Sequence, residues 1–305
     1  MNILSVVLPV RNRAKRVVAT LESMGIQNAP VDYILVDNDS TDSTLEVLRE
    51  WADRINADSS GANVRVLSNS QPGAAATRNA GLKAVRTEYV LFFDSDDVMR
   101  PGHLNRVIDY LRANPETDIL GFTFVLHLPS GKVTRQFHMT DTLFHGMFHG
   151  GFATLLWCVR TALLRRAGGW NAGVRLWDDM EVMVRVMEAR PHARMGFIPE
   201  ISADIHPTGD SITQSTITTM LKDIEPALNS ISRHLPVEKR VWVEYLRIIN
   251  AGNVSRHGGE NKSRSVVRDV LRRNRHPRHR WLLRFAYIYS ASGFRGAARI
   301  IRKFI

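Results

Sequence analysis

Residues 89–97 have the sequence YVLFFDSDD, in which a short apolar segment runs directly into an acidic turn. Five apolar residues that end at a polar turn are typical of a buried strand. Carboxylates two positions apart, here Asp94 and Asp96, can approach one divalent cation, which prefers oxygen ligands. Taken alone, the turn is more simply explained as a cap for the helix that follows Pro101. Other parts of the sequence are therefore needed to distinguish a cation site from a helix cap.

Strands that alternate with helices precede this segment. The further strands predicted from their apolar runs are residues 3–10, 33–37 and 64–67. Such alternation predicts an α/β fold with a mainly parallel central sheet, in which ligands bind at the carboxyl ends of the strands. Asn12, Asp37 and Asp94 each follow or end a strand, so we expect these polar side chains at one edge of the sheet.

The acidic turn is the last of four sequence blocks that occur in a fixed order. They are VVLPVRN at 6–12, ILVDNDSTD at 34–42, GAAATRNAGL at 73–82 and FFDSDD at 92–97. Together they resemble the family 2 glycosyltransferases over about residues 3–210. The resemblance implies a GT-A fold and an inverting transfer of a sugar from a nucleoside-diphosphate sugar, with UDP favoured, to an acceptor hydroxyl.

The resemblance also implies roles for individual residues on the donor side. Asp37 would accept a hydrogen bond from a pyrimidine base, Asp94 would approach the ribose, and Arg78 would suit a phosphate or a base carbonyl. Arg11 stands where relatives often have an aromatic residue. The implied nucleotide-binding residues are Pro9, Arg11, Asn12, Asp37, Arg78, Asn79 and Asp94. Asp96 and His206 would hold Mn²⁺ or Mg²⁺.

A second chemical block contains GGW at 168–170 and LWDDMEVMVR at 176–185. It resembles the acceptor side of the family, where an acidic pair opens a helix. Asp179 would then be the general base that deprotonates the acceptor hydroxyl, and the acceptor-side residues would be Trp170, Trp177 and Asp178. The simpler alternative is that both aspartates cap the helix, with Glu181 and Arg185 as a surface ion pair.

The sequence predicts two regions. Residues 1–215 would form the GT-A domain, with a nucleotide-sugar half over about 1–115 and an acceptor half over about 116–215. Residues 216–305 would form a helical C-terminal region, because the pattern is helical from about Thr218. Residues 262–305 contain thirteen Lys or Arg and one acid, Asp269. This charge predicts an anionic partner, such as a membrane surface, a phosphorylated lipid or nucleic acid.

The end of this region has two interpretations. Over residues 294–305, apolar and basic residues separate onto two sides of a helix, which fits either an interfacial helix on anionic lipid or an ordinary helix docked on the protein. The first interpretation would imply a saccharide acceptor linked to lipid, as in the assembly of bacterial surface polysaccharide or glycolipid.

Amino-acid composition restricts the class of protein further. The 305 residues are 44% hydrophobic and 23% charged, which fits a globular protein rather than a disordered one. With one cysteine and no predicted signal peptide or transmembrane segment, we expect a cytoplasmic protein, with peripheral contact at the inner face of the cytoplasmic membrane as the further hypothesis. The alternatives are a nucleotidyltransferase-like enzyme, or a non-catalytic scaffold or nucleic-acid-binding protein. Nucleic acid is disfavoured because no zinc spacing or aromatic-basic motif is present.

Overall fold

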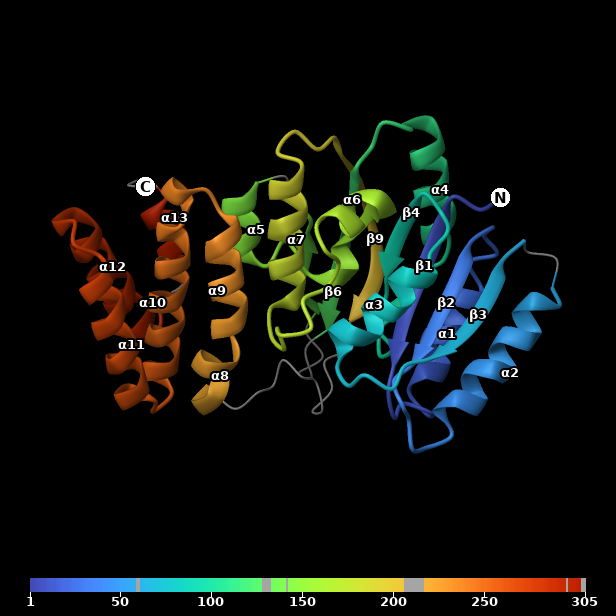
Figure 1. The fold of residues 1–305 in the computed structure, drawn as a ribbon, viewed down its shortest axis with the longest axis horizontal. Helices are drawn as coiled ribbons and strands as arrows, with labels where there is room; N and C mark the ends of the chain where they lie inside the picture. Colours follow the sequence, from blue (N-terminus) through green and yellow to red (C-terminus); the bar gives the residue numbers. More distant parts are fainter. Residues whose placement is uncertain (59–60, 128–132, 141, 206–216, 295, 303–305) are drawn as a thin grey trace. The chain divides into compact units, whose positions relative to one another are not determined.

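The computed structural model describes residues 1–58, 61–127, 133–140, 142–205, 217–294 and 296–302 (Figure 1). The chain divides into two compact units. The first contains Met1–Gly173 and Asp178–Thr208, and the second contains Val174–Trp177 and Gly209–Ile305. In the described residues, the first unit is a mixed sheet with helices, and the second is helical. The predicted α/β class with a helical C-terminal region is confirmed.

The beginning of the first unit alternates strands with helices. Its elements are β1 (Leu4–Val10), α1 (Val17–Gly25), β2 (Asp32–Asp37), α2 (Thr44–Asn56), β3 (Asn63–Ser68), α3 (Ala74–Ala84) and β4 (Tyr89–Phe92). The strands lie in the order β3-β2-β1-β4, and each neighbouring pair is parallel. All of β4 and nearly all of β1 is buried, which explains why these strands are apolar without alternation.

The carboxyl ends of these parallel strands lie along one edge of the sheet. Val10, the last residue of β1, pairs with Asp37, the last residue of β2. Phe92, at the end of β4, pairs with Val7 on β1. The turns that carry Asn12, Asp37 and Asp94 therefore start from the same edge, as the alternation of strands and helices predicts.

Helix α3 approaches β1 unusually closely at one residue. A Cβ placed on Gly81 would lie 2.4 Å from Cγ1 of Val7 and 3.3 Å from Cγ2 of Val36. Only a residue without a side chain allows this helix to pack at that depth. The approach matters for the site because α3 also carries Arg78 and Asn79.

The rest of the first unit extends the same sheet with a different pairing. Its elements are β5 (Val98–Met99), α4 (His103–Ala113), β6 (Ile119–His127), β7 (Val133–His138), α5 (Leu143–His149), the 3₁₀ turn Thr154–Leu156, β8 (Trp157–Arg160), α6 (Thr161–Arg166), α7 (Asp178–Ala189) and β9 (Met195–Ile205). The strand order continues as β4-β8-β6-β9-β5, with β7 on β6. Here the pairs are antiparallel except for β6 with β9, so the parallel arrangement is concentrated in the first half.

The second unit consists of helices packed around α10. Its described helices are α8 (Ile217–Asp223), α9 (Glu225–His234), α10 (Val241–Arg256), α11 (Glu260–Arg273), α12 (Pro277–Ala291) and α13 (Ala297–Ile301), with a 3₁₀ turn at Val237–Lys239. Helix α10 packs against both α11 and α12. It also buries Arg247, whose guanidinium donates to Glu225, Glu244 and Asn229. A central helix buried around most of its circumference has to satisfy such a charge internally.

The end of the second unit favours one of the two interpretations that the sequence left open. Ala297, Ala298 and Ile301 of α13 are buried, and α13 packs against α12. The apolar side of this helix is therefore used inside the protein, as in the docked alternative. No helix in the described part of the chain combines the length and the apolarity that crossing a bilayer requires.

The close approach at Gly81 gives a first prediction. In an isolated helix, Gly→Ala is stabilising by about 1 kcal/mol. We expect Gly81→Ala instead to lower the free energy of unfolding by about 1–3 kcal/mol, because the new methyl group overlaps Val7. Urea unfolding measures the change, with Lys83→Ala on the exposed side of α3 as the control. A stabilised Gly81→Ala protein would contradict the packing described.

Candidate active site

Two turns at the edge of the parallel strands are joined around Asn12. Its backbone has a left-handed conformation, with φ of 49°. Its side-chain oxygen accepts a hydrogen bond from the Thr41 backbone N–H at 2.8 Å, and its backbone N–H donates to Ser40 Oγ at 2.9 Å. The turn after β1 and the turn after β2 therefore form one surface. Asn12, predicted to bind nucleotide, holds that surface together.

Asp37 lies in this surface with one oxygen satisfied and the other without a protein partner. Its Oδ2 accepts from the Ser40 amide at 3.1 Å. Its Oδ1 is buried and has no hydrogen-bond partner among the described residues. A buried carboxylate oxygen is costly to leave without a donor. Asp37 therefore keeps one buried acceptor that no described protein group uses.

The other two residues predicted at the base differ in exposure. Pro9 is half-buried within β1, and Arg11 is exposed in the turn that follows. Asn38, which the sequence analysis did not select, fixes the loop before α3. Its side chain donates to the Asn69 and Gln71 carbonyls and accepts from the Gly73 amide. An amide side chain directly after Asp37 was the available signal, but its partners lie more than thirty residues away.

The acidic turn after β4 concentrates negative charge. Burial and the neighbouring Asp94 raise the pKa of Asp96, and burial with the two neighbouring acids raises the pKa of Asp97 to about 9. Asp96 lies 3.5 Å from the guanidinium of Arg13. Arg13 was also not selected from the sequence. In the described residues no group of three or more His, Cys, Asp or Glu side chains has the arrangement of a metal site.

Arg78 connects the acidic turn to the start of α7. Its guanidinium donates to Asp94 Oδ1 at 2.9 Å and to Asp178 Oδ2 at 2.8 Å. It lies 4.5 Å from the centre of the Trp170 ring. Burial alone would lower the pKa of Arg78, but Asp94 and Asp178 raise it above its ordinary value. One buried guanidinium thus joins the turn after β4 to the start of α7, two segments that are far apart in sequence.

Trp170 forms the apolar floor beneath Arg78. Its ring stacks on Trp157 with centroids 5.9 Å apart and meets the edge of Phe92 at 5.2 Å. Asn79 donates to the Trp170 carbonyl at 2.7 Å and accepts from its amide at 2.9 Å. The Trp170 ring is therefore in the core rather than on an open acceptor surface, and the Asn79 amide, predicted to bind nucleotide, is used to position it.

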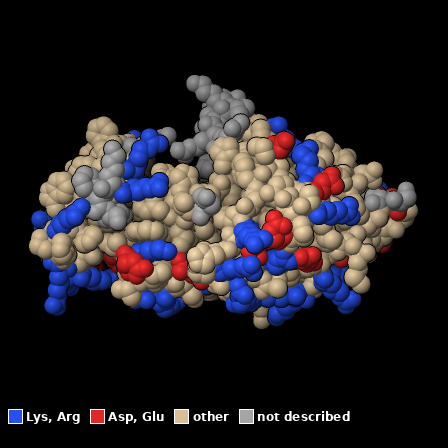
Figure 2. Space-filling view, turned by 90° about the horizontal axis from the view of Figure 1, so that it is seen from above, with Lys and Arg blue, Asp and Glu red and all other residues tan. Residues whose placement is uncertain are grey.

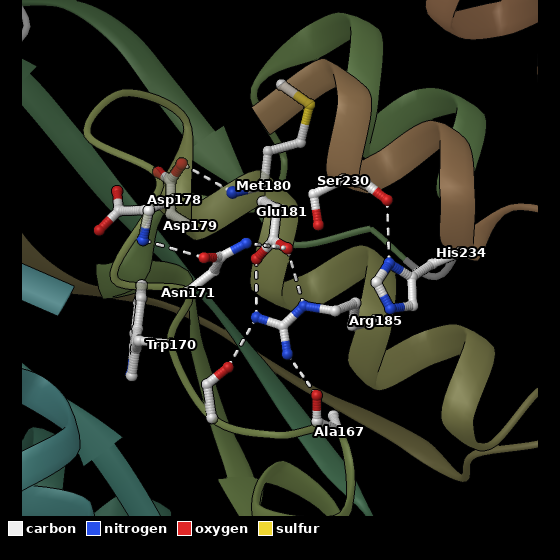
Figure 3. Close-up of polar contacts among 12 residues, drawn as sticks. Ala167, Trp170, Asn171, Asp178, Asp179, Met180, Glu181, Arg185, Ser230 and His234 are labelled. Atoms are coloured by element: carbon white, nitrogen blue, oxygen red, sulfur yellow. Dashed lines mark hydrogen bonds and ion pairs between the residues drawn. The ribbon is translucent and has the colours of Figure 1, made fainter. Parts of the chain in front are cut away.

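A buried ion pair supports the turn that carries Trp170 (Figure 3). Arg185 donates to both oxygens of the fully buried Glu181, at 2.8 and 2.7 Å. The same guanidinium donates to the carbonyls of Ala167 and Gly169. Glu181 and Arg185 are indeed an i,i+4 pair, but the pair is buried and not on the surface.

Asp178 and Asp179 begin α7, as the acidic pair in the sequence predicts. Asp179 Oδ1 accepts from the Met180 amide at 2.7 Å. Burial and the neighbouring Asp178 raise the pKa of Asp179 to about 7, and burial also raises the pKa of Asp178 (Figure 3). Trp177, directly before them, has a left-handed backbone with φ of 63°. Asp179 can therefore exchange a proton near neutral pH.

His206, the second predicted metal ligand, lies outside the described residues. Asp204 precedes it on β9 and is described. Its carboxylate accepts from Arg100 at 2.7 and 2.8 Å and lies 2.7 Å from Nε2 of His127. The sequence analysis did not select this cluster, because its members lie on three separate strands or strand ends.

Comparison with known proteins identifies relatives of this chain. Residues 5–168 of the 305 match the family model described as Glycosyl transferase family 2. An uncharacterized glycosyltransferase of Haemophilus influenzae is 20% identical over 196 residues, which cover 61% of this chain and 62% of that protein. The Staphylococcus aureus poly(ribitol-phosphate) beta-N-acetylglucosaminyltransferase TarS is 33% identical over 96 residues, 30% of this chain and 16% of TarS. The chain thus matches less than two thirds of the length of either relative.

Solved structures agree in fold. Staphylococcus aureus TarS 1–349 in complex with UDP-GlcNAc has a TM-score of 0.70 at 17% identity, covering 99% of this chain and 92% of that one. The mannosyltransferase PcManGT from Pyrobaculum calidifontis, in complex with GDP-Man and Mn²⁺, has a TM-score of 0.61 at 15% identity, covering 98% and 85%. The predicted GT-A fold is confirmed by this similarity.

The buried Glu181–Arg185 pair gives a second prediction. Arg185→Met leaves Glu181 buried without its cation, so we expect the free energy of unfolding to fall by about 3–5 kcal/mol in urea titrations. The double variant Glu181→Met/Arg185→Met removes both charges and serves as the matched control. It should recover much of the loss. A single variant as stable as the wild type would show that the pair does not support the turn.

Proposed function

The chain belongs to glycosyl transferase family 2, and from this premise we propose that it transfers a sugar from a nucleoside-diphosphate sugar to an acceptor hydroxyl with inversion. The observation that carries the proposal is the bridge formed by Arg78 between Asp94 and Asp178. It brings the acidic turn at the sheet edge next to the acidic pair of α7. A single-step transfer needs these two groups close together, because the nucleophile is deprotonated while the diphosphate departs.

Asp37 would select the nucleotide. Its unpartnered Oδ1 can accept the imide N–H of uracil, which supports UDP as the favoured donor nucleotide. The surface formed by the turns after β1 and β2 would hold the base, with Pro9 and Arg11 beside it and Asn12 fixing its shape. Asp94 would approach the ribose, and Arg78 would offer donors to the donor phosphates.

Asp179 would act as the general base. A carboxyl group with a pKa near 7 is well matched to proton abstraction at neutral pH. Its position at the start of α7 favours the ionised form, while burial and Asp178 oppose it. Asp178, held by Arg78, would then position Asp179 and tune its basicity.

The acidic turn fits a divalent cation of the Mg²⁺ or Mn²⁺ class in part. Asp94 and Asp96 supply two carboxylates whose mutual repulsion a cation would relieve, and such ions are commonly held by one or two carboxylates together with substrate phosphates. A bound cation would neutralise charge on the departing diphosphate. Asp96 and His206 would hold it, and Asp94, which would approach the ribose, would add its negative charge beside them.

The acceptor and the location are further parts of the proposal. TarS, by its name, acts on poly(ribitol-phosphate), and this supports a saccharide or lipid-linked saccharide acceptor in the assembly of bacterial surface polysaccharide or glycolipid. We place the protein at the inner face of the cytoplasmic membrane, and the basic charge of residues 262–305 supports this. Family membership favours this function over nucleotidyl transfer. Asp94, Asp96 and Asp179 together argue against a silent scaffold.

Nucleotide selection is tested by thermal unfolding with UDP, GDP, dTDP and CDP, each with and without Mn²⁺. A ligand at a hundred times its Kd stabilises the native state by about 2.7 kcal/mol. We expect the largest shift with UDP. Asp37→Asn should weaken UDP binding roughly 10- to 100-fold, because it loses a hydrogen bond to a charged acceptor. Asp39→Asn, the same change at an exposed site two residues away, is the control. Equal shifts for all four nucleotides in the wild type would argue against selection by Asp37.

Metal use is tested in the same assay. Asp96→Asn should keep a metal-independent shift with UDP and lose the additional shift that Mn²⁺ produces, because one of two charged ligands is removed. Isothermal titration of Mn²⁺ in the presence of UDP checks the same point directly. A variant that retains the full Mn²⁺ effect would exclude Asp96 as a ligand.

The base is tested by the pH dependence of kcat/KM. Since Asp179 must be ionised, activity should rise with pH through about 7. Asp178→Asn removes the like charge that raises this pKa, so the rise should move to lower pH, whereas Glu188→Gln near the end of α7 should leave it in place. Asp179→Asn should lower kcat by about 10²–10⁴-fold. A profile unchanged by Asp178→Asn would contradict the proposed tuning.

A further inference from the structure

Helix α12 carries a line of aromatic rings on its surface. Trp281 and Phe285 stack with centroids 5.9 Å apart, Phe285 and Tyr289 lie 5.6 Å apart, and Tyr289 and Phe294 lie 5.2 Å apart. We refer to these four residues as the aromatic ladder. Trp281 is 63% exposed and Phe294 is 64% exposed. Ile288, on the same helix, is 62% exposed.

The second unit does not use this face of α12 for its own core. The residues of α12 that pack inward are Leu282, Leu283, Ala286 and Ser290, all of them buried. Helix α10 approaches them so closely that a Cβ on Gly252 would lie 2.7 Å from Cβ of Ser290. Trp281 and Ile288 are exposed away from this packed face, and Phe285 and Tyr289 are half-buried beside it. Three of the eight large apolar side chains exposed in the described residues occur within this short stretch, so the exposure is concentrated and not scattered.

Positive charge lies on the same helix as the ladder. Arg278 and Arg284 of α12 are exposed. Helix α12 contains no acidic residue. Figure 2 shows Lys and Arg side chains next to uncharged surface over the C-terminal helices, at the left of the view. An apolar strip bordered by arginines is complementary to a surface that is apolar inside and anionic outside.

We propose that the exposed face of α12 docks on an anionic lipid bilayer. Aromatic rings are favoured at the level of the lipid headgroups, where one part of the ring is apolar and its edge is polar. Ile288 would enter the acyl boundary between them. Arg278 and Arg284 can lay their aliphatic parts along the apolar strip while their guanidinium groups reach lipid phosphates. The proposal assigns membrane contact to α12, whereas the short helix α13 buries its apolar side within the protein.

A lipid surface fits these residues better than the other candidates. A second copy of the chain in a two-fold interface would bring arginines against the same arginines, and like charges in contact are unfavourable. Nucleic acid would use the rings to stack bases, but the Trp281 and Phe285 rings stack on each other and Ile288 has no stacking surface. The inference deepens the membrane location in the proposed function. It rests on that location and not on the chemistry of sugar transfer.

The test is sedimentation of the full chain with phosphatidylcholine vesicles, with and without phosphatidylglycerol. We expect binding to the anionic vesicles that weakens as salt is raised. The double variant Trp281→Ser/Ile288→Ser should reduce the apparent affinity at least about tenfold, because it removes the apolar strip. Arg278→Gln/Arg284→Gln should reduce binding to anionic vesicles and make it less dependent on salt, because two of the cations are removed. Ile26→Ser, an equally exposed apolar residue on the first unit, is the matched control and should bind as the wild type does.

Other outcomes would overturn the proposal. The first is a wild-type chain that stays in the supernatant, and the second is a set of variants that bind vesicles as well as the wild type does. The third is a dimer, seen by light scattering, that Trp281→Ser abolishes. The fourth is binding to single-stranded RNA that the same substitution abolishes. The UDP-induced thermal shift is measured on every variant and should not change. If vesicle binding fails while that shift persists, the docking surface is wrong and the donor site stands. If the UDP-induced shift is absent while the chain binds vesicles, the proposed donor site is wrong and the docking surface stands.

Discussion

The candidate active site depends on one buried arginine side chain. Arg78 neutralises Asp94 and Asp178 together while its guanidinium lies against the Trp170 ring. Burial raises the pKa of Asp178, and the charge of Arg78 opposes that rise. The bridge therefore links the turn after β4 to the start of α7 and balances the charge between them.

The bridge is precise because its surroundings are rigid. Helix α3, which carries Arg78, packs closely against the sheet at Gly81. Asn79, which follows Arg78, forms two hydrogen bonds with the backbone of Trp170. Arg185, which is paired with the buried Glu181, donates to the carbonyl of Gly169 and so supports the turn that carries Trp170. The Asn79 side chain is paired with backbone, and Glu181 and Arg185 are paired with each other, so these groups support the acids that the chemistry would need.

The two units differ in where their unusual polar and apolar groups lie. In the first unit, the unpartnered Oδ1 of Asp37 and the acidic turn after β4, with its raised carboxyl pKa values, lie at the edge of the parallel strands. In the second unit, the buried guanidinium of Arg247 has protein partners, and exposed apolar side chains lie on α12. An enzyme that modifies an acceptor held at a membrane would benefit from this division, because attachment and catalysis then place separate demands on the sequence.

The sequence by itself determined the parallel half of the sheet, the helical C-terminal region and the family, because these depend on local patterns: aliphatic runs, turn residues and the order of four motifs. It also located the acidic pair at the start of α7. Tertiary structure alone decided how β8 and β9 join the sheet, since β8 has four residues and β9 contains Pro199, and neither has a strong strand pattern. It alone decided the contacts of Arg78, Asn79 and Trp170, and the burial of Glu181 with Arg185. Whether a side chain contacts a ligand, a distant backbone or a buried charge is set by segments that approach only when the chain folds, and no spacing along the sequence records those approaches.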